Sequence, residues 1–330
     1  MIKKPLFEIK IYKQIFVIGA IFAATSHTYS AGYIFKPASN FKIKIMQSKP
    51  HTDTSINDQI SNDTPVLISN KFSFTEGPAA DKEGNIFFTD QPNNQIWKYG
   101  IDGKLSLFMD NTGRSNGMYF DNEGNIVSCA DEHNKLVAIS PLKEITVLAD
   151  NFNGEIFNGP NDVWVNSVNG DIYFTDPYYK RDYWPKNHPH IAEQNVYYLK
   201  KNNRNVLLAA REMTKPNGII GTPDGKYLYV ADIGANKTYR FTIDDKGNLI
   251  NKQLFVSQGS DGMTIDEKGN IYLTGKGVTV YNKDGKMIQQ IPIPEAWTAN
   301  VCFGGKNRDE LFITASKSVY VLRTNVKSVQ

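Results

Sequence analysis

The chain has 330 residues, and its 37 lysines and arginines nearly balance its 34 aspartates and glutamates, which leaves a formal net charge of +3. The lysines are scattered and form no basic stripe, which argues against nucleic acid as a partner. The 17 Tyr, 18 Phe and 25 Gly residues are typical of an all-β protein with many turns.

The first thirty residues differ in composition from the rest of the chain. Lysines at positions 3, 4, 10 and 13 precede the apolar run 15–24, and Thr28-Tyr-Ser30 places small residues just before Ala31. This order is that of a cleavable secretory signal. An uncleaved membrane anchor is the alternative, but an apolar core of about ten residues is too short to span a bilayer comfortably. We therefore expect residues 1–30 to be removed, and a periplasmic or secreted protein without membrane attachment.

Residues 31–63 are rich in Ser, Asn, Asp, Thr and Lys and show no hydrophobic period. This composition predicts a poorly ordered leader before the folded domain. The run 65–69 (Pro-Val-Leu-Ile-Ser) then has the composition of a strand. The folded domain is expected to cover residues 64–326.

A short unit recurs along that domain. It consists of a glycine, a polar or basic residue and a run of β-branched and aromatic residues. It begins at glycines 84, 124, 170, 225 and 269, and a sixth copy at 309–315 lacks the glycine. The glycines lie 40 to 55 residues apart, and a period of this size with several short strands per repeat is typical of propeller blades. The six copies predict an all-β fold, a six-bladed β-propeller.

The two ends of the domain predict how the propeller closes. The sixth copy ends with the strand-like run 318–323, after which little of the chain remains. The run 65–69 has no repeat of its own in front of it. Because a propeller must hide the edges of its sheets, we expect the 65–69 strand to complete the last blade and close the ring. A monomer is expected.

A polar residue lies at an equivalent place upstream of each copy. In a propeller the first strand of every blade lines the central channel, so residues at the same place in six such strands face one another in a ring. The predicted ring consists of Glu76, Asn116, Asn161, Asn217, Asp261 and Asn300.

This ring of carboxylates and amides offers an oxygen at every position. Hard cations such as Ca²⁺ and Mg²⁺ prefer oxygen ligands, whereas Zn²⁺ usually prefers nitrogen and sulfur. The alternative is that Asn and Asp stand there because β-turns need them. Turn formation explains one or two positions but not the same register in all six copies, so the ring predicts a divalent cation site.

The residues around the ring also resemble those of a known family, from about residue 65 to 325. The matching segments are 74–78 (Phe-Thr-Glu-Gly-Pro), 148–154, 157–163 (Phe-Asn-Gly-Pro-Asn-Asp-Val), 172–177, 216–219 (Pro-Asn-Gly-Ile), 261–263 and 300–305. They are similar to the gluconolactonase/regucalcin (senescence marker protein) family, above all to its exported bacterial gluconolactonases. Diisopropyl fluorophosphatase and strictosidine synthase share the fold more distantly.

The resemblance implies one divalent cation at the mouth of the channel, Ca²⁺ before Mg²⁺, Mn²⁺ or Zn²⁺. By motif, Glu76, Asn161 and Asp261 match the family's metal ligands, and Asn217 matches a fourth position that ligates in part of the family. Asp261 also matches the residue usually assigned as the catalytic acid or base.

Other residues correspond to substrate contacts. Arg114 and Asn116 resemble the family's contacts to substrate hydroxyls, and Asn300 is assigned to the substrate with them. The chain departs from the family where Gly117 stands in place of a frequent Asp, and where the loop 177–184 is long and aromatic. This loop bears on the size of the substrate more than on the metal.

Such a site would support hydrolysis of a lactone or ester. A bound cation polarises a carbonyl and lowers the pKa of a bound water, while a carboxylate such as Asp261 can relay the proton to the leaving oxygen. Asp261 could instead only steer the water, or attack directly. Two alternatives remain open: an aryl-ester or phosphotriester hydrolase in the same metal site, and a non-catalytic propeller that binds a sugar. A binding-only relative should have lost a carboxylate, and both Glu76 and Asp261 are present.

Overall fold

The computed structural model describes residues 59–329, except for 186–187, 202 and 204. In this part of the chain 26 strands and two short 3-10 helices account for the regular structure. None of the described helices is long and apolar enough to cross a membrane. The predicted signal at 1–30 and the predicted leader as far as residue 58 lie outside the described residues.

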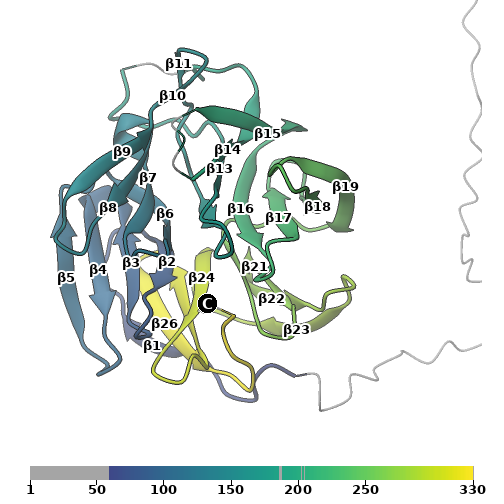
Figure 1. The fold of residues 1–330 in the computed structure, drawn as a ribbon. Coiled ribbons are helices and arrows are strands. Elements are labelled where there is room, and N and C mark those ends of the chain that lie inside the picture. Colours follow the sequence, from purple (N-terminus) through teal and green to yellow (C-terminus); the bar gives the residue numbers. More distant parts are fainter. Residues whose placement is uncertain (1–58, 186–187, 202, 204, 330) are drawn as a thin grey trace, which may run out of the picture. The chain divides into compact units, whose positions relative to one another are not determined.

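The strands pair antiparallel, in sequence order, into six blades around a channel, which confirms the predicted six-bladed β-propeller (Figure 1). Blade one consists of β2 (Thr75–Ala80), β3 (Ile86–Asp90), β4 (Gln95–Tyr99) and β5 (Leu105–Asp110). Blade two consists of β6 (Ser115–Phe120), β7 (Ile126–Ala130), β8 (Lys135–Ile139) and β9 (Ile145–Ala149). Blade three consists of β12 (Val163–Val165), β13 (Ile172–Asp176), β14 (Gln194–Leu199) and β15 (Val206–Met213).

The second half of the chain repeats this pattern. Blade four consists of β16 (Pro216–Gly221), β17 (Tyr227–Asp232), β18 (Lys237–Ile243) and β19 (Leu249–Val256). Blade five consists of β20 (Met263–Ile265), β21 (Ile271–Gly275), β22 (Gly277–Tyr281) and β23 (Met287–Ile291). Blade six contains β24 (Thr298–Gly304), β25 (Glu310–Ala315) and β26 (Ser318–Arg323). Between blades two and three lies the hairpin β10 (Asn151–Phe152) and β11 (Glu155–Ile156).

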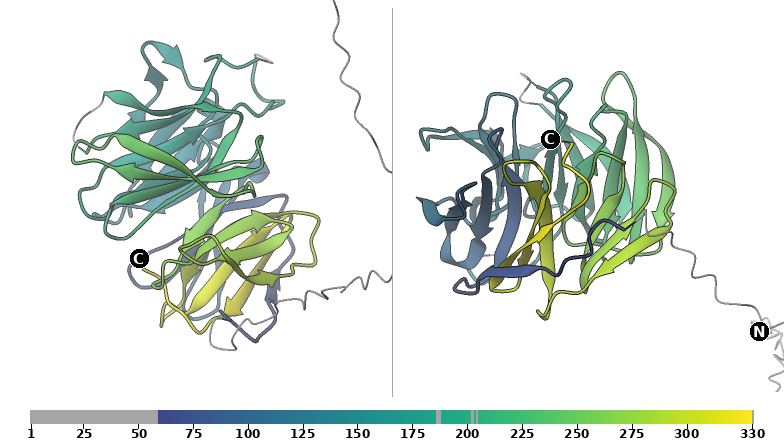
Figure 2. Two further views of the ribbon diagram at one scale, coloured as in Figure 1. Left: turned by 90° about the vertical axis from the view of Figure 1, so that its right-hand side faces the viewer. Right: turned by 90° about the horizontal axis from the view of Figure 1, so that it is seen from below.

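Blade six takes its fourth strand from the other end of the domain. Strand β1 (Val66–Ser69) pairs antiparallel with β26, with Val66 opposite Val321 and Leu67 opposite Tyr320 (Figure 2). This pairing confirms the predicted closure of the ring. As the outermost strand of blade six, β1 covers the edge of β26, which would otherwise be open to pairing with other chains.

The residues just before β1 also pack on the propeller. The Ile60 side chain is only 1% exposed and lies in the core cluster of blades five and six. Its backbone N–H donates to the Gln289 side chain at 2.8 Å, and the Ser61 hydroxyl donates to the Arg323 carbonyl at 2.6 Å. Ordered contacts with the propeller therefore begin upstream of residue 64.

The recurring apolar run of the sequence becomes the second strand of each blade. Strands β3, β7, β13 and β21 are buried at every residue. Neighbouring blades cover both faces of these strands, so an apolar run without polar alternation is favoured there. The outermost strands, such as β5, β9 and β19, consist mostly of exposed and partly buried residues. The core thus consists of layers between blades, built from aromatic side chains such as Trp164, Tyr173 and Tyr229.

Candidate active site

The six predicted ring residues lie at one level of the channel. Glu76, Asn116, Asn217 and Asn300 belong to the inner strands β2, β6, β16 and β24, while Asn161 and Asp261 lie just before β12 and β20. The regular strand pairing is interrupted at this level in blades one, two, four and six. Such β-bulges redirect side chains and are frequent at functional sites. The side chains of all six are buried except that of Asp261, which is partly exposed.

Contacts between neighbouring blades hold the ring together. The Gly117 N–H donates to the Asn161 carbonyl at 2.8 Å, and the Thr175 hydroxyl donates to the Asn217 carbonyl at 2.9 Å. Several ring residues are followed by glycine because the next blade is so near. A Cβ on Gly77 would lie 1.9 Å from the Asn116 carbonyl oxygen, and one on Gly117 would lie 2.3 Å from Oδ1 of Asp162.

Gly117 is the position where the family often has an aspartate, and the structure gives a reason for the departure. Any side chain at Gly117 would collide with Asp162, which extends toward it from the neighbouring blade. Asp162 therefore supplies a buried carboxyl at this part of the ring. Burial raises its pKa to about 8, against hydrogen bonds from the Val163 N–H and the Asn300 side chain. Asp162 was not among the predicted ring residues, because the repeat marks only its neighbour Asn161 in this blade.

Asp261 is held by two hydrogen bonds at the mouth of the ring. Its Oδ1 accepts from Asn217 Nδ2 at 2.8 Å, and its Oδ2 accepts from Trp297 Nε1 at 2.5 Å. Burial raises the pKa of Asp261 to about 6, and these two hydrogen bonds and the charge of Arg181 oppose the rise. Trp297 was not among the predicted site residues, since it lies between two repeats.

Glu76 and Asp261 interact electrostatically. Burial raises the pKa of Glu76 well above its usual range, and the nearby charges of Asp261 and Asp162 raise it further. A hydrogen bond from the Asn300 side chain and one from the Gly77 N–H, at 2.8 Å, act in the opposite direction. The structure thus brings together Glu76, Asp261, Asn217 and Asn300 through side-chain interactions.

These residues fit a hard divalent cation. No group of three or more His, Cys, Asp or Glu side chains is placed to hold a metal within the described ranges, so the shell would combine carboxylates with amides. A divalent ion would offset the negative charge of Asp261, which raises the pKa of the buried Glu76. Asn217 turns its Nδ2 to Asp261 and to the Tyr179 hydroxyl, both at 2.8 Å, which leaves its Oδ1 as a candidate ligand. Asn161 lies in the same ring.

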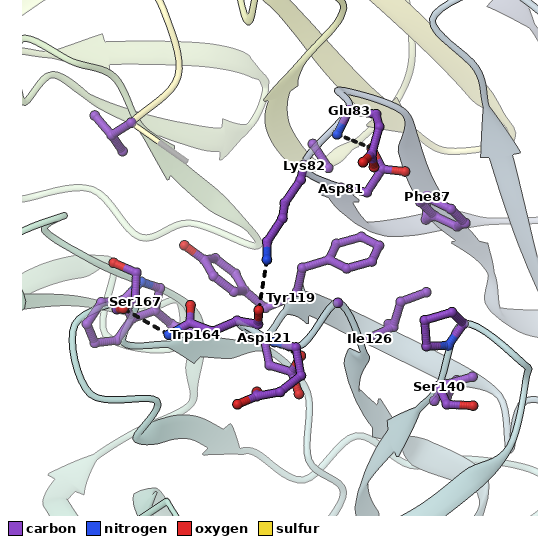
Figure 3. Close-up of a pocket in the computed structure, with 18 of the residues that line it drawn as sticks. Asp81, Lys82, Glu83, Phe87, Tyr119, Asp121, Ile126, Ser140, Trp164 and Ser167 are labelled. Carbon is purple, nitrogen blue, oxygen red and sulfur yellow. Dashed lines mark hydrogen bonds between the residues drawn. The ribbon is translucent and has the colours of Figure 1, made fainter.

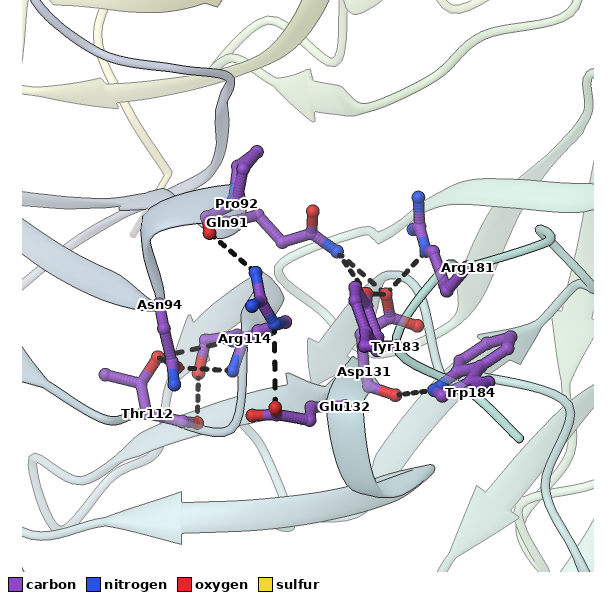
Figure 4. A network of polar contacts seen from close by, with 11 residues as sticks. Gln91, Pro92, Asn94, Thr112, Arg114, Asp131, Glu132, Arg181, Tyr183 and Trp184 are labelled. Atoms are coloured by element: carbon purple, nitrogen blue, oxygen red, sulfur yellow. Dashed lines mark hydrogen bonds and ion pairs between the residues drawn. The ribbon is translucent and has the colours of Figure 1, made fainter.

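The loop 177–185, which we call the roof loop, folds over this end of the channel (Figure 4). Its anchor is Asp131, at the start of the 3-10 helix η3 (Asp131–His133). Oδ2 of Asp131 accepts from Arg181 Nε at 2.7 Å and from the Tyr183 hydroxyl at 2.5 Å. Gln91 Nε2, from the 3-10 helix η2 (Gln91–Asn93), donates to the same oxygen at 2.7 Å. The length and aromatic content of the loop were visible in the sequence, but its anchor was not.

Arg114 lies at the rim rather than in the ring. Its Nη1 donates to the Pro92 carbonyl at 2.5 Å, and its Nε lies 3.6 Å from a Glu132 carboxylate oxygen. The guanidinium also stacks on the Tyr183 ring, with Cζ 4.6 Å from its centroid. The two residues of the predicted substrate-binding pair therefore lie apart: Asn116 belongs to the ring, and Arg114 lies at the rim. Tyr183 of the roof loop contacts Arg114.

The opposite end of the channel contains a cavity of about 430 Å³ (Figure 3). Its walls include the turns that join the first and second strands of several blades, with Lys82, Phe87, Phe120 and Trp164 among the lining residues. Between this cavity and the ring lies a void of about 20 Å³ beside Asp162 and Asn300. That void holds little more than a water molecule, so it has no room for a sugar lactone.

Comparisons with known proteins agree with this architecture. The family model described as "SMP-30/Gluconolactonase/LRE-like region" matches residues 74–317. A gluconolactonase from Zymomonas mobilis is 30% identical over 79% of this chain and 82% of its own length. The lactonase drp35 of Staphylococcus aureus is 28% identical over 69% of this chain and 72% of its own length.

A solved structure supports the same assignment. A gluconolactonase from Xanthomonas campestris superposes with a TM-score of 0.77 at 25% identity, and the match covers 83% of this chain and 93% of that one. The match to the family model extends over all six blades and includes every predicted site residue. The chain therefore belongs to the SMP-30/gluconolactonase/LRE-like family.

Proposed function

We propose that this lactonase hydrolyses a sugar-derived lactone, such as an aldonolactone, with a divalent cation held by Glu76, Asn161, Asn217 and Asp261. The observation that carries the proposal is the electrostatic interaction of two carboxyls at the open end of the channel. Glu76 is buried, and the partly exposed Asp261 accepts a hydrogen bond from Asn217. The related gluconolactonase and the lactonase drp35 supply the substrate class. Ca²⁺ is the expected ion, because the ligand set consists of carboxylate and amide oxygens.

When bound, the cation would supply Lewis acidity to a carbonyl and lower the pKa of a water molecule. The protein contributes a positioned proton acceptor, Asp261. Its two hydrogen bonds, from Asn217 and Trp297, fix the plane of the carboxylate. Its raised pKa of about 6 brings it closer to neutral pH than an ordinary aspartate, which favours proton transfer in both directions. Asp261 thus accepts a proton from the attacking water and returns one to the leaving ring oxygen.

The remaining ring residues are assigned to the substrate. Asn116 and Asn300 present amide groups, which both donate and accept hydrogen bonds and therefore suit a polyhydroxylated ligand. Arg114 lies nearer the rim, within reach of hydroxyls or of the carboxylate that forms on ring opening.

We also propose that the protein acts in the periplasm or outside the cell. The support is the order of the first thirty residues, in which lysines, an apolar core and a small-residue cleavage site follow one another. Fusion of residues 1–35 to a reporter that is active only after export would test this, with the apolar run 15–24 interrupted by two arginines as the control.

The function is tested with purified mature protein that has been stripped by a chelator and reloaded with Ca²⁺, Mg²⁺, Mn²⁺ or Zn²⁺. Acid release from glucono-1,5-lactone is followed in a pH-stat, with an aryl ester and a phosphotriester as comparison substrates. We expect hydrolysis of the lactone above the buffer rate that is lost on chelation and restored by reloading. Preference for the aryl ester or phosphotriester would assign the same site to another hydrolase reaction. Binding of a sugar without turnover would make the propeller a binding module.

A further inference from the structure

Two cationic side chains stand beside one tyrosine of the roof loop. Lys215 Nζ lies 4.4 Å from the centroid of the Tyr179 ring, and the guanidinium carbon of Arg181 lies 5.6 Å from it. The Tyr179 hydroxyl accepts from Asn217, which also donates to Asp261. The tyrosine therefore connects the two cations to the candidate metal ring.

Lys215 is placed there by the strand that carries a ring residue. It directly precedes β16, and its backbone N–H donates to Oδ1 of Asp232 at 2.9 Å. Asn217 follows two residues later in the same strand. Because the backbone of Lys215 is fixed in this way and its stem is half-buried, its ammonium group is confined to the neighbourhood of the Tyr179 ring.

Two other cations at this end of the channel each have a carboxylate beside them. Arg181 pairs with Asp131 at 2.7 Å, and Arg114 lies 3.6 Å from Glu132. A divalent ion in the ring would balance Glu76 and Asp261. Lys215 has no carboxylate partner in the part of the chain that the structure describes. The Lys215 ammonium group beside the Tyr179 ring is therefore available to an anionic group of a ligand.

We propose that Lys215, with Arg181 on the same tyrosine, forms an anion subsite that binds a charged group at the end of the sugar lactone remote from its carbonyl. The group would be an exocyclic phosphate, sulfonate or carboxylate. This inference rests on the proposed function, because it assigns a substrate class to the same site. A lysine ammonium suits such groups as a compact charge with several donors. Arg181 donates through Nε to Asp131, and the other N–H groups of its guanidinium can donate to an anion.

The test compares two lactones that differ only at the remote end, glucono-1,5-lactone and its 6-phosphate, on the metal-loaded protein. The wild type should show a KM about tenfold lower for the phosphate, the scale of one charged contact. Lys215→Gln should raise KM for the phosphate about tenfold more than KM for the neutral lactone. The 6-sulfonate and the lactone of glucaric acid then show whether sulfonate and carboxylate are accepted as well. Lys252→Gln is the matched control, because Lys252 Nζ lies 4.4 Å from the Tyr239 ring on an outer strand.

Calorimetry separates this inference from the proposed function. Metal-loaded wild type should bind 6-phosphogluconate more tightly than gluconate, and Lys215→Gln should abolish the difference whereas Lys252→Gln should keep it. A wild type that does not distinguish the two ligands, in KM or in Kd, overturns the anion subsite. Equal losses for both ligands in Lys215→Gln overturn it too, because Lys215 would then only support Tyr179. If no lactone is hydrolysed but 6-phosphogluconate binds through Lys215, the subsite stands and the lactonase proposal fails.

Discussion

Glu76 is buried and Asp261 is only partly exposed, and the charge of Asp261 raises the pKa of Glu76. Neither carboxyl forms an ion pair with a lysine or arginine among the described residues. Hydrogen bonds from Asn217, Trp297 and Asn300 compensate for part of the lost hydration. Burial of unpaired carboxylates costs free energy unless a cation or a proton neutralises them. A divalent ion at this site would remove part of that cost and would stabilise the folded protein by mass action.

Replacement of Glu76 by glutamine tests whether the charge of Glu76 contributes to binding of a divalent ion. An amide oxygen can still ligate but carries no charge, so Glu76→Gln should weaken Ca²⁺ binding about tenfold or more, which is about 1.4 kcal/mol. Calorimetric titration of the chelator-treated protein measures the effect. Glu83→Gln, in a turn at the far end of the channel, is the control and should bind as the wild type does. An unchanged Ca²⁺ affinity in Glu76→Gln would exclude Glu76 as a ligand.

Asp261→Asn separates ligation from proton transfer. The amide oxygen can still face the metal, but the side chain can no longer accept and release a proton. We expect kcat for the lactone to fall on the order of 10²- to 10⁴-fold, while Ca²⁺ still raises Tm. Trp297→Phe removes only the hydrogen bond to Oδ2 of Asp261 and should have a smaller effect on kcat. Turnover close to that of the wild type in a metal-binding Asp261→Asn protein would show that the proton moves by another route.

At the scale of elements, the strands supply the ring and the loops between them close the site. Aspartates at the ends of β3, β13 and β17 each accept hydrogen bonds from two backbone N–H groups of the loop that leads into the same blade. In blade three, Asp176 accepts from Asn158 at 2.9 Å and from Gly159 at 2.8 Å. These hydrogen bonds fix the loop just ahead of Asn161 and so position a candidate ligand.

The raised pKa of Asp176 predicts how the stability of the fold depends on pH. Burial raises its pKa to about 7, against the two backbone hydrogen bonds, whereas an unfolded aspartate has a pKa of about 4. The folded protein then keeps a proton that the unfolded chain releases. The stability that this proton contributes is fully present below about pH 4 and is lost as the pH rises through about 7.

Urea unfolding at pH 5 and pH 8 measures this contribution. Asp176→Asn removes the titration and one acceptor, so its loss of stability relative to the wild type should be smaller at pH 8 than at pH 5. Asp244→Asn is the control, because Asp244 is exposed and hydrogen bonds from Asn248 lower its pKa. Asp244→Asn should change the free energy of unfolding by the same amount at pH 5 and at pH 8. A loss in Asp176→Asn that grows with pH would contradict the assignment.

At the scale of the whole molecule, the propeller is closed by one strand from the N-terminal side of the domain. Strand β1 covers β26, and Ile60 and Ser61 extend the contact past the strand. Loss of this strand would leave β26 with an unpaired edge and would uncover part of the blade six core. Closure by a short segment makes the stability of the ring depend on a few residues far from the site.

Truncation of the mature chain tests this dependence. Deletion of residues 31–58 should leave Tm nearly unchanged. Deletion of 31–70 removes Ile60 together with β1 and should abolish cooperative unfolding or soluble expression. An intermediate deletion of 31–63 keeps β1 and should lower Tm, because burial of one isoleucine contributes about 2–5 kcal/mol when compared with its removal. Equal Tm values for all three proteins would show that the closing strand is dispensable.

Much of this protein could be predicted from its sequence, because the information is local and repeated. A turn followed by a buried strand recurs with every blade, with a glycine in five of the six, and the polar residue upstream belongs to the same part of each blade. That repetition was enough to predict the six blades, the closing strand and the six ring residues. It could not give their mutual distances or the burial that raises the pKa of Glu76 and Asp261.

Only the tertiary structure decided what surrounds the ring. Asp162 stands where the other blades have glycine or valine, and Tyr179 and Trp297 lie outside the strands, so the repeat marks none of the three. Asp131 anchors the roof loop through Tyr183 and Arg181, which are about fifty residues away along the chain. Contacts of this kind depend on which loop folds over the end of the channel, and that depends on packing between blades rather than on any local preference of the backbone.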